Sequence, residues 1–270
     1  MLRILLSEEI EMTHRKQAVV LIHGLFGSLN DPKILAEFDQ VEVHAPDLIG
    51  YGALSQQETA GIDLLAQAEH VAKYILDAGI EQAHIVGHSV GGAIAVLLAD
   101  RFPELVASLI SVEGNLTIKD AFWSAELASM PIEKVEEIVA GYRHAPSDWF
   151  ASAGVPITEW TSRLATSWLS NQPATTIKAQ ASAVVEATKP NSYLQTLSRL
   201  IDSGLAVSLI AGSRSPDGWD VPEWLTRTCT MRINIADTGH LMMAESPARF
   251  SSAIQTCVAY NRPTGHNVVS

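Results

Sequence analysis

The feature that most constrains the fold of this chain is a G-x-S-x-G pentapeptide at residues 87–91, centred on Ser89. It follows an apolar run at 84–86 and precedes a stretch of mostly small, apolar residues at 92–99. This order predicts a strand, a sharp turn and a buried helix, with the Ser89 Oγ raised above a sheet. Glycines flank the turn because a Cβ there would collide with the neighbouring backbone. The pattern therefore predicts that Ser89 is a nucleophile.

A serine hydroxyl is a weak nucleophile near neutral pH, so Ser89 needs a general base. His240 is the predicted base, because it follows the strand-like segment 231–236 and precedes a helix that begins at Ser246 and Pro247. Its position completes the chain order serine, acid, histidine that accompanies this elbow. Of the other histidines, we expect His23 and His88 to brace loops.

The elbow also requires an oxyanion hole. One donor is expected to be the N–H of Val90, the residue after the nucleophile, and the second an N–H from the loop after an earlier strand. The segment 18–22 predicts that strand, and it leads into the glycine-containing segment 23–28, so the second donor is assigned to Leu25. Phe26, in the same loop, is expected either to pack in the core or to form a wall of the pocket.

Together these segments resemble an α/β-hydrolase, and more closely the cap-bearing serine esterases of that superfamily. The resemblance rests on HGLFGS at 23–28, APDLIGYG at 45–52, the elbow, Gly239-His240 and ESP at 245–247. It covers nearly the whole chain in the family's order. It implies an α/β fold with a mostly parallel sheet flanked by helices, no cofactor, and a helical cap inserted after the strand that follows the elbow helix.

The acid of the triad departs from the family's usual pattern. It normally stands about three residues after a glycine like Gly212, where this chain has Ser215. Asp217 and Asp220 follow in the same loop and are alternatives. We favour Glu113, because it comes directly after the strand-like segment 109–112, where some superfamily members place the acid. A buried, unpaired glutamate would be costly, and the His240 Nδ1–H would provide a partner.

Alternating strand-like and helical segments predict βα units around a parallel sheet. The expected core comprises residues 1–114 and 201–270, with a helix at 62–78. The expected strands lie at 2–6, 18–22, 41–45, 83–86, 105–112, 205–211 and 230–235.

Residues 115–200 break this rhythm with helical patterns and several prolines, which predicts a helical cap. Four of the six tryptophans of the chain lie here, and they either form the cap's own core or line the substrate pocket. The candidate substrate-binding residues are therefore Phe26, Trp123, Trp149, Trp160 and Trp168. No basic cluster marks the cap as an anion clamp, although Arg143, Arg163 and Lys178 are separate candidates for that role.

Composition limits the partners and the compartment. A net charge of −12 with no basic cluster argues against binding nucleic acid or anionic lipid. Two cysteines are too few for a stapled secreted scaffold, so a cytoplasmic location is expected. The apolar run at 1–6 is too short for a signal sequence or a membrane span. No metal-ligand spacing is present, and the sequence does not define an oligomeric state.

These observations predict a serine-dependent hydrolase of carboxylic esters with small to medium apolar substrates. The same triad also serves hydrolysis of thioesters, enol lactones or C–C bonds, and a lyase reaction, which the sequence separates poorly from ester hydrolysis. Haloalkane dehalogenases and epoxide hydrolases need a carboxylate where this chain has Ser89. A small-molecule receptor without catalysis is the alternative from a different functional class.

Overall fold

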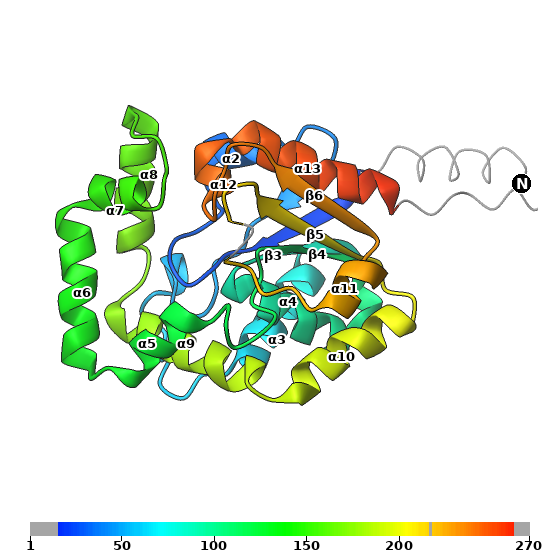
Figure 1. The fold of residues 1–270 in the computed structure, drawn as a ribbon, viewed down its shortest axis with the longest axis horizontal. Coiled ribbons are helices and arrows are strands. Elements are labelled where there is room, and N and C mark those ends of the chain that lie inside the picture. Colours follow the sequence, from blue (N-terminus) through cyan, green and yellow to red (C-terminus); the bar gives the residue numbers. More distant parts are fainter. Residues whose placement is uncertain (1–15, 216–217, 262–270) are drawn as a thin grey trace, which may run out of the picture.

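The computed structural model describes residues 16–215 and 218–261 of the chain, so the strand expected at 2–6 lies outside the described residues. The described residues form one six-stranded sheet in the order β2-β1-β3-β4-β5-β6, in which every neighbouring pair is parallel (Figure 1). The strands are β1 (Ala18–Ile22), β2 (Glu42–His44), β3 (Ala83–His88), β4 (Val106–Val112), β5 (Val207–Gly212) and β6 (Met231–Ile235). The predicted α/β fold with a mostly parallel sheet flanked by helices is confirmed.

Helices cover both faces of the sheet, and the strand residues alternate between two apolar cores. In β1, Val20 and Ile22 pack in one core and Val19 and Leu21 in the other, because successive strand side chains point to opposite faces. One face is covered by α3 (Leu64–Asp77), α4 (Val90–Arg101) and α10 (Asn191–Asp202). The other is covered by α13 (Pro247–Tyr260) and the short α2 (Pro32–Leu35) (Figure 1).

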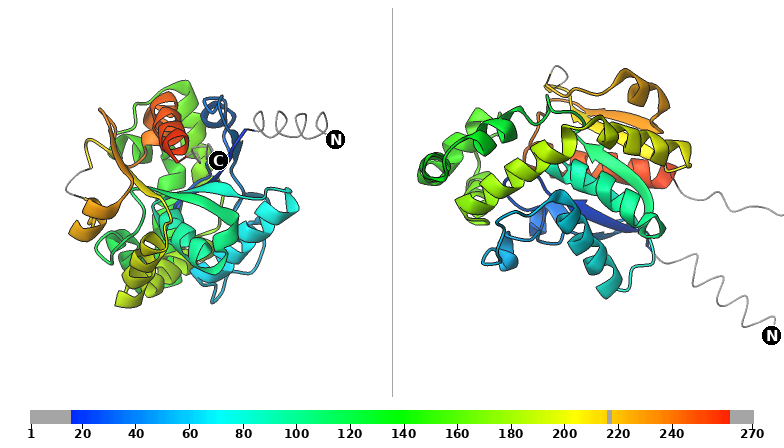
Figure 2. Two further views of the ribbon diagram at one scale, coloured as in Figure 1. Left: turned by 90° about the vertical axis from the view of Figure 1, so that its right-hand side faces the viewer. Right: turned by 90° about the horizontal axis from the view of Figure 1, so that it is seen from below.

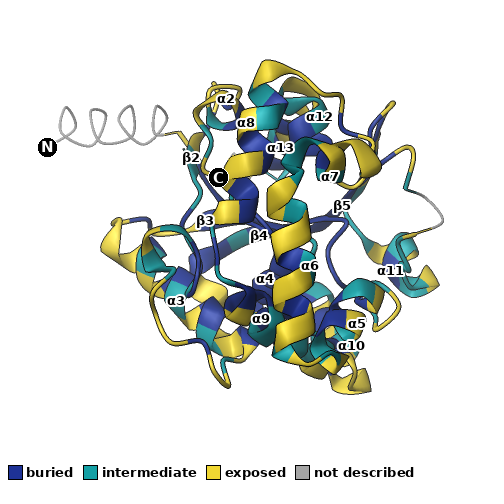
Figure 3. Ribbon diagram, turned by 90° about the vertical axis from the view of Figure 1, so that its left-hand side faces the viewer, coloured by how far each residue is buried: buried dark blue, intermediate teal, exposed yellow. Residues whose placement is uncertain are grey.

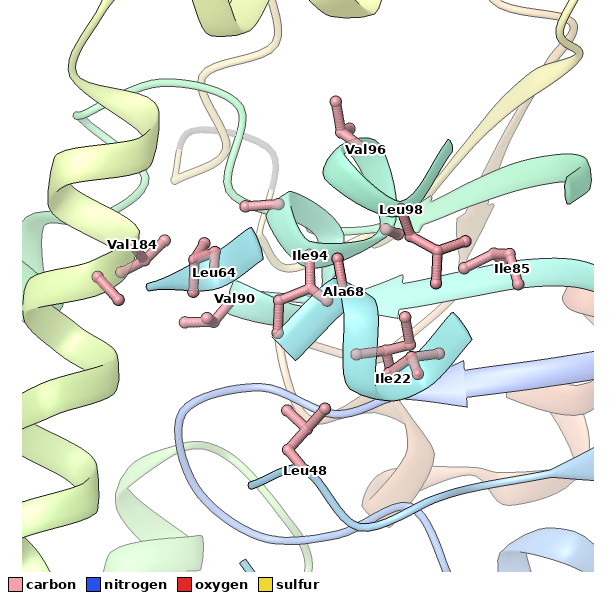
Figure 4. Close-up of a cluster of buried hydrophobic side chains, with 14 of the residues drawn as sticks. Ile22, Leu48, Leu64, Ala68, Ile85, Val90, Ile94, Val96, Leu98 and Val184 are labelled. Carbon is pink, nitrogen blue, oxygen red and sulfur yellow. The ribbon is translucent and has the colours of Figure 1, made fainter. Parts of the chain in front are cut away.

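The core between the sheet and α4 is closely packed. Figure 4 shows Ile22 of β1 and Ile85 of β3 next to Ile94 and Leu98 of α4, with Ala68 of α3 between the helices. All five side chains are completely buried. Each fully buried leucine or isoleucine contributes roughly 1.5–3 kcal/mol relative to exposure. This packing fixes α4, and therefore the residues at its N-terminus, relative to the sheet.

The strand register brings distant residues to one edge of the sheet. His88 at the end of β3 pairs with Val112 of β4, Val112 pairs with Ile210 of β5, and Gly212 pairs with Ile235 of β6. Since the strands are parallel, their carboxyl ends lie side by side. Residues directly after β3, β4, β5 and β6 therefore meet at the same edge, which is where ligands bind in open α/β sheets.

Between β4 and β5 the chain forms helices. They are α5 (Phe122–Ser129), α6 (Ile132–His144), α7 (Pro146–Ser152), α8 (Glu159–Ser170), α9 (Ala174–Thr188) and α10. Figures 1 and 2 show α6 and α7 standing apart from the sheet, with α8 beside them. Figure 3 shows that the outer face of α6 is exposed. In α6 the buried residues Val135 and Val139 are four positions apart, so only one face of the helix is covered. Helix α10 packs against α4 as well as α9, and the boundary expected at residue 200 falls inside it.

Two short helices complete the described chain. They are α11 (Glu223–Thr228), between β5 and β6, and α12 (Met242–Glu245), between β6 and α13. Helix α12 follows directly after the loop that contains His240. Its buried residues, Met242, Met243 and Ala244, pack in the same core as α13 and thereby anchor the loop that precedes it.

Candidate active site

Ser89 lies in the sharp turn between β3 and α4, with φ of 54° and ψ of −122°. A Cβ built on Gly87 would lie 2.3 Å from the Gly91 carbonyl oxygen, and one on Gly91 would lie 2.3 Å from the Ile22 carbonyl oxygen. Neither position can hold a larger residue unless the backbone moves. The turn is thus fixed by close backbone packing, and it presents Ser89 at the carboxyl edge of the sheet.

Glu113 and His240 form a direct pair at the same edge. The His240 Nδ1 lies 2.7 Å from the Glu113 Oε2, and the Glu113 Oε1 accepts a 2.8 Å hydrogen bond from the Gly212 N–H. Glu113 is only 6% exposed, so both carboxylate oxygens have the partners that a buried charge requires. When Nδ1 carries the proton and donates to Glu113, the Nε2 is left as an acceptor, which is the tautomer a general base needs.

The loop that carries His240 is held by a second carboxylate. The nearly buried side chain of Glu245 accepts from the Gly239 N–H at 2.8 Å through Oε1, and its Oε2 lies 2.5 Å from the Arg214 Nη2. The Arg214 side chain also donates to the Asp237 carbonyl through its Nη1. The backbone N–H of Arg214 donates to the Thr238 carbonyl at 2.9 Å. Sequence reasoning missed the pairing of Arg214 with Glu245. Only the position of Glu245 in the ESP segment hinted at a special role.

His88 and His23 lie next to the site and serve as internal braces, as expected. The His88 Nε2 donates to the His240 carbonyl at 2.9 Å, and burial holds the pKa of His88 well below its ordinary value, so it is neutral. The His23 Nδ1 donates to the Gly24 carbonyl at 2.8 Å, and burial lowers the pKa of His23 to about 4. Each ring thus has a backbone carbonyl as its partner, and His240 stays the predicted base for Ser89.

The loop after β1 runs beside Ser89. A Cβ built on Gly24 would lie 3.0 Å from the Ser89 Cβ and 3.4 Å from its Oγ, so the backbone of Gly24 reaches the nucleophile. The peptide that joins Leu25 to Phe26 is held in place because the buried Tyr51 hydroxyl donates to the Leu25 carbonyl at 3.0 Å. Val90 is the first residue of α4, so its N–H has no acceptor within the helix. The loop that carries Leu25 and the first residue of α4 both adjoin Ser89, and the Leu25 and Val90 N–H groups stay the predicted donors of the oxyanion hole.

Ser89 and His240 both line a cavity of about 400 Å³. No hydrogen bond joins the Ser89 Oγ to the His240 Nε2 in the described structure, and such bonds often form at full strength only when substrate is bound. Phe26, Trp123 and Trp149 line the cavity as expected. Phe26 stacks on Trp123 with ring centroids 5.0 Å apart and lies 5.6 Å from the Trp149 ring. The three rings form a continuous apolar wall.

The other two expected tryptophans do not line this cavity. Trp168 is 3% exposed and packs in the core against Phe150 and Gly27, where a Cβ on the glycine would meet the indole at 2.5 Å. Trp160 lies under the Lys33 ammonium, 4.3 Å from the ring centroid, and its Nε1 donates to the Asp31 carboxylate. Both rings connect α8 to segments near β1, which is why they point away from the nucleophile.

The cations of the helical insertion also lie away from the cavity. Arg143 donates to the carbonyls of Leu169 and Gln172, and Lys178 donates to the carbonyls of Ala128 and Met130. Arg163 forms an exposed pair with Glu159 on α8. The cation that does line the cavity is Arg214, whose charge is matched by Glu245.

The structure also locates the alternative acids. The Asp220 carboxylate accepts a 2.8 Å hydrogen bond from the Thr117 hydroxyl and pairs with Lys119, so it is engaged away from His240. Asp217 lies outside the described residues. Ser215, at the family's usual acid position, lines the cavity but carries no charge.

Residues 16–215 and 218–261 contain no group of histidine, cysteine or acidic side chains arranged to hold a metal ion. The helices of the same residues include none with the length and apolarity needed to cross a membrane.

Known proteins resemble this chain in sequence and in fold. The model of a family described as alpha/beta hydrolases matches residues 19–253. Lipase 3 of Moraxella sp. (strain TA144) is 32% identical over 111 residues, which is 40% of this chain and 34% of that protein. This chain spans about a third of the length of the curated relatives it matches.

Two solved structures share the fold over most of both chains. A carboxylesterase structure from the thaumarchaeon Nitrososphaera gargenis has a TM-score of 0.70 at 18% identity and covers 92% of this chain and 91% of its own. A thermophilic esterase from Thermogutta terrifontis has a TM-score of 0.67 at 22% identity, with coverage of 92% and 91%.

Proposed function

Since the chain belongs to the α/β-hydrolase family, we propose that it is a serine hydrolase that cleaves carboxylic esters with small to medium apolar groups. One observation carries this proposal: the strained Ser89 faces a cavity that it shares with the Glu113–His240 pair. The geometry supports a nucleophile, a base and an orienting acid at one point. A receptor without catalysis would not need the pair or the strained turn.

The proposed reaction proceeds by acyl transfer. The His240 Nε2 takes the Ser89 hydroxyl proton while the Oγ attacks the ester carbonyl, and Glu113 stabilises the imidazolium that forms. The N–H groups of Leu25 and Val90 hold the oxyanion. The imidazolium then protonates the departing alcohol oxygen, and the C–O bond breaks to leave an acyl-enzyme. Water, deprotonated by His240, attacks the acyl carbon and releases the acid and free Ser89.

The cavity supports the substrate class. Its aromatic wall of Phe26, Trp123 and Trp149 suits an apolar acyl or alcohol group. We propose that the helical insertion acts as a cap that closes over this group, so that its residues choose the substrate. A C–C, thioester or enol-lactone substrate would use the same triad, and the esterases and lipase to which the chain is similar favour the ester.

The proposal also covers the setting of the enzyme. Cys229 and the buried Cys257 are both free, which fits a reducing compartment such as the cytoplasm. The substrate would be a small molecule. The net charge of −12 does not favour nucleic acid or an anionic membrane as a partner.

A fluorophosphonate probe tests the nucleophile, because it reacts covalently with an activated serine. We expect a single labelled site, Ser89, by mass spectrometry of the digested protein. The Ser89→Ala variant should lose both labelling and turnover of p-nitrophenyl butyrate, with little change in thermal midpoint. Ser215→Ala, which removes another hydroxyl from the cavity wall, should still be labelled. Labelling that survives in Ser89→Ala would refute the assignment.

A further inference from the structure

Asn115 is the second residue after Glu113, and its backbone is fully used by the fold. Its N–H donates to the Ser89 carbonyl at 2.9 Å, and its carbonyl accepts a 2.8 Å hydrogen bond from the buried Tyr193 hydroxyl. These two bonds hold Asn115 beside the nucleophile. The backbone from which the Asn115 side chain projects is therefore fixed at the carboxyl edge of the sheet.

The side-chain amide oxygen of Asn115, in contrast to its backbone, takes no part in the hydrogen bonds of the fold. Asn115 is 3% exposed and lines the cavity, and its Oδ1 has no hydrogen-bond partner among the described residues. A buried polar group without a partner costs roughly 1–3 kcal/mol, and nearly all such groups in folded proteins are satisfied. The cavity that Asn115 lines is where a bound ligand can supply the missing partner.

The chemistry of that partner follows from the amide and its neighbours. A hydroxyl can donate to an amide oxygen and can accept from an amide N–H, so it satisfies either orientation of the Asn115 side chain. A carboxylate is disfavoured, because the Asp120 carboxyl group lines the same cavity. The charge of Arg214 is matched by Glu245 and does not offset Asp120.

We infer that Asn115 is a specificity-determining residue that binds a hydroxyl group of a neutral ester, close to the scissile carbonyl. The aromatic wall then takes the remaining apolar part of the substrate. This inference rests on the proposed ester hydrolysis and narrows it to hydroxylated esters. It assigns no role in the chemical step to Asn115.

Two pairs of isosteric esters test the inference, since each pair exchanges one hydroxyl for a methyl group. Methyl 3-hydroxybutyrate and methyl 3-methylbutyrate place the group on the acyl side. The 2-hydroxyethyl and propyl esters of butyric acid place it on the alcohol side. In the native protein we expect kcat/KM to favour the hydroxylated member of one pair by about tenfold, the effect of roughly 1.4 kcal/mol.

The Asn115→Leu variant removes the amide at nearly constant volume. We expect it to abolish that preference while changing kcat/KM for the methyl member of the pair by less than about threefold. Asn234→Leu provides a matched control, because the same exchange is made at an exposed position on β6 that does not line the cavity. The control should keep the preference, and a fluorophosphonate probe should label Ser89 in both variants.

The outcomes separate the inference from the proposed function. If the native protein hydrolyses the esters but shows no preference for a hydroxyl, or if Asn115→Leu keeps the preference, the inference is wrong and ester hydrolysis stands. An equal loss for both members of a pair in Asn115→Leu also overturns it, because the amide would then support the fold or the chemical step. If no ester is hydrolysed and Ser89 is not labelled, the proposed function fails and the inference fails with it.

Discussion

Three residues other than glycine have a left-handed φ among the described residues: Ser89 at 54°, Glu113 at 40° and Asp237 at 57°. Each lies just after a strand at the carboxyl edge of the sheet, and two of them are the proposed nucleophile and acid. Such conformations cost on the order of 1–3 kcal/mol each and persist only where the surroundings hold them. Here the sharp turn lets a side chain leave the end of its strand toward the cavity.

The charge on Glu113 is the first property to test at this scale. We expect Glu113→Gln to lower kcat for p-nitrophenyl butyrate by roughly two to four powers of ten, because the amide would favour the wrong tautomer of His240. Glutamine keeps the shape of the side chain, so circular dichroism should show an unchanged fold.

The comparison variant is Asp217→Asn, which removes the alternative acid. It should lower kcat by less than about tenfold if Glu113 orients His240. If Asp217→Asn loses most of its kcat and Glu113→Gln keeps a nearly normal kcat, the acid of the triad is Asp217, in the loop after β5. If neither variant matters, the enzyme is a Ser-His dyad.

At the scale of elements, the site depends on how closely β1, β3, β4 and α4 approach one another. A Cβ on Gly91 would clash with the β1 backbone, and one on Gly92 would lie 2.5 Å from the Gly114 Cα, directly after Glu113. The start of α4 thus touches both neighbouring segments through glycines. In contrast, a Cβ on Gly141 in α6 would have no atom within 4 Å apart from its chain neighbours and the backbone of its own helix.

These surroundings predict opposite effects of the same substitution. Gly141→Ala should stabilise the protein by about 0.5–1 kcal/mol, because alanine is a better helix former and meets open space. Gly91→Ala should destabilise it by several kcal/mol or prevent folding, since backbone atoms cannot yield as a flexible side chain can. Urea unfolding followed by circular dichroism measures both. A tolerated Gly91→Ala with normal activity would contradict the close approach described for the elbow.

For the whole molecule, the buried neutral histidines link stability to pH. Burial lowers the pKa of His23 from 6.5 to about 4, and it also lowers that of His88. Below pH 6.5 the unfolded chain therefore binds protons that the folded chain does not. The contribution of these two histidines to the free energy of unfolding is complete above about pH 6.5 and is lost as the pH falls toward 4.

The expected loss from His23 alone is about 2 kcal/mol between pH 7 and pH 5, at roughly 1.4 kcal/mol per pH unit below its unfolded pKa. Urea unfolding of the native protein at a series of pH values should show a decline in this window. The His23→Gln variant should show a decline smaller by about that amount, whatever its absolute stability. His144→Gln changes an exposed histidine on α6 and should keep the native slope. Equal slopes in all three proteins would contradict a buried, neutral His23.

The sequence by itself determined the local framework of this protein. Strand β1 was predicted with its observed bounds, and the other described strands within a few residues, because apolar patterns and glycine-rich turns depend on the nearest neighbours. Chain order and turn chemistry also selected Ser89, His240 and Glu113 as a triad. The structure places Glu113 beside His240 and Ser89 in the same cavity, and their catalytic roles stay predictions.

Only the tertiary structure decided which side chains face the cavity. Nothing in the local sequence distinguishes Trp123 and Trp149, which line it, from Trp160 and Trp168, which pack α8 against the region near β1. The partnership of Arg214 with Glu245, and the unpaired amide of Asn115, were equally invisible. The physical reason is the same in each case: a helix or strand pattern fixes which face of an element is apolar, whereas the direction of that face depends on how elements far apart in the chain pack together.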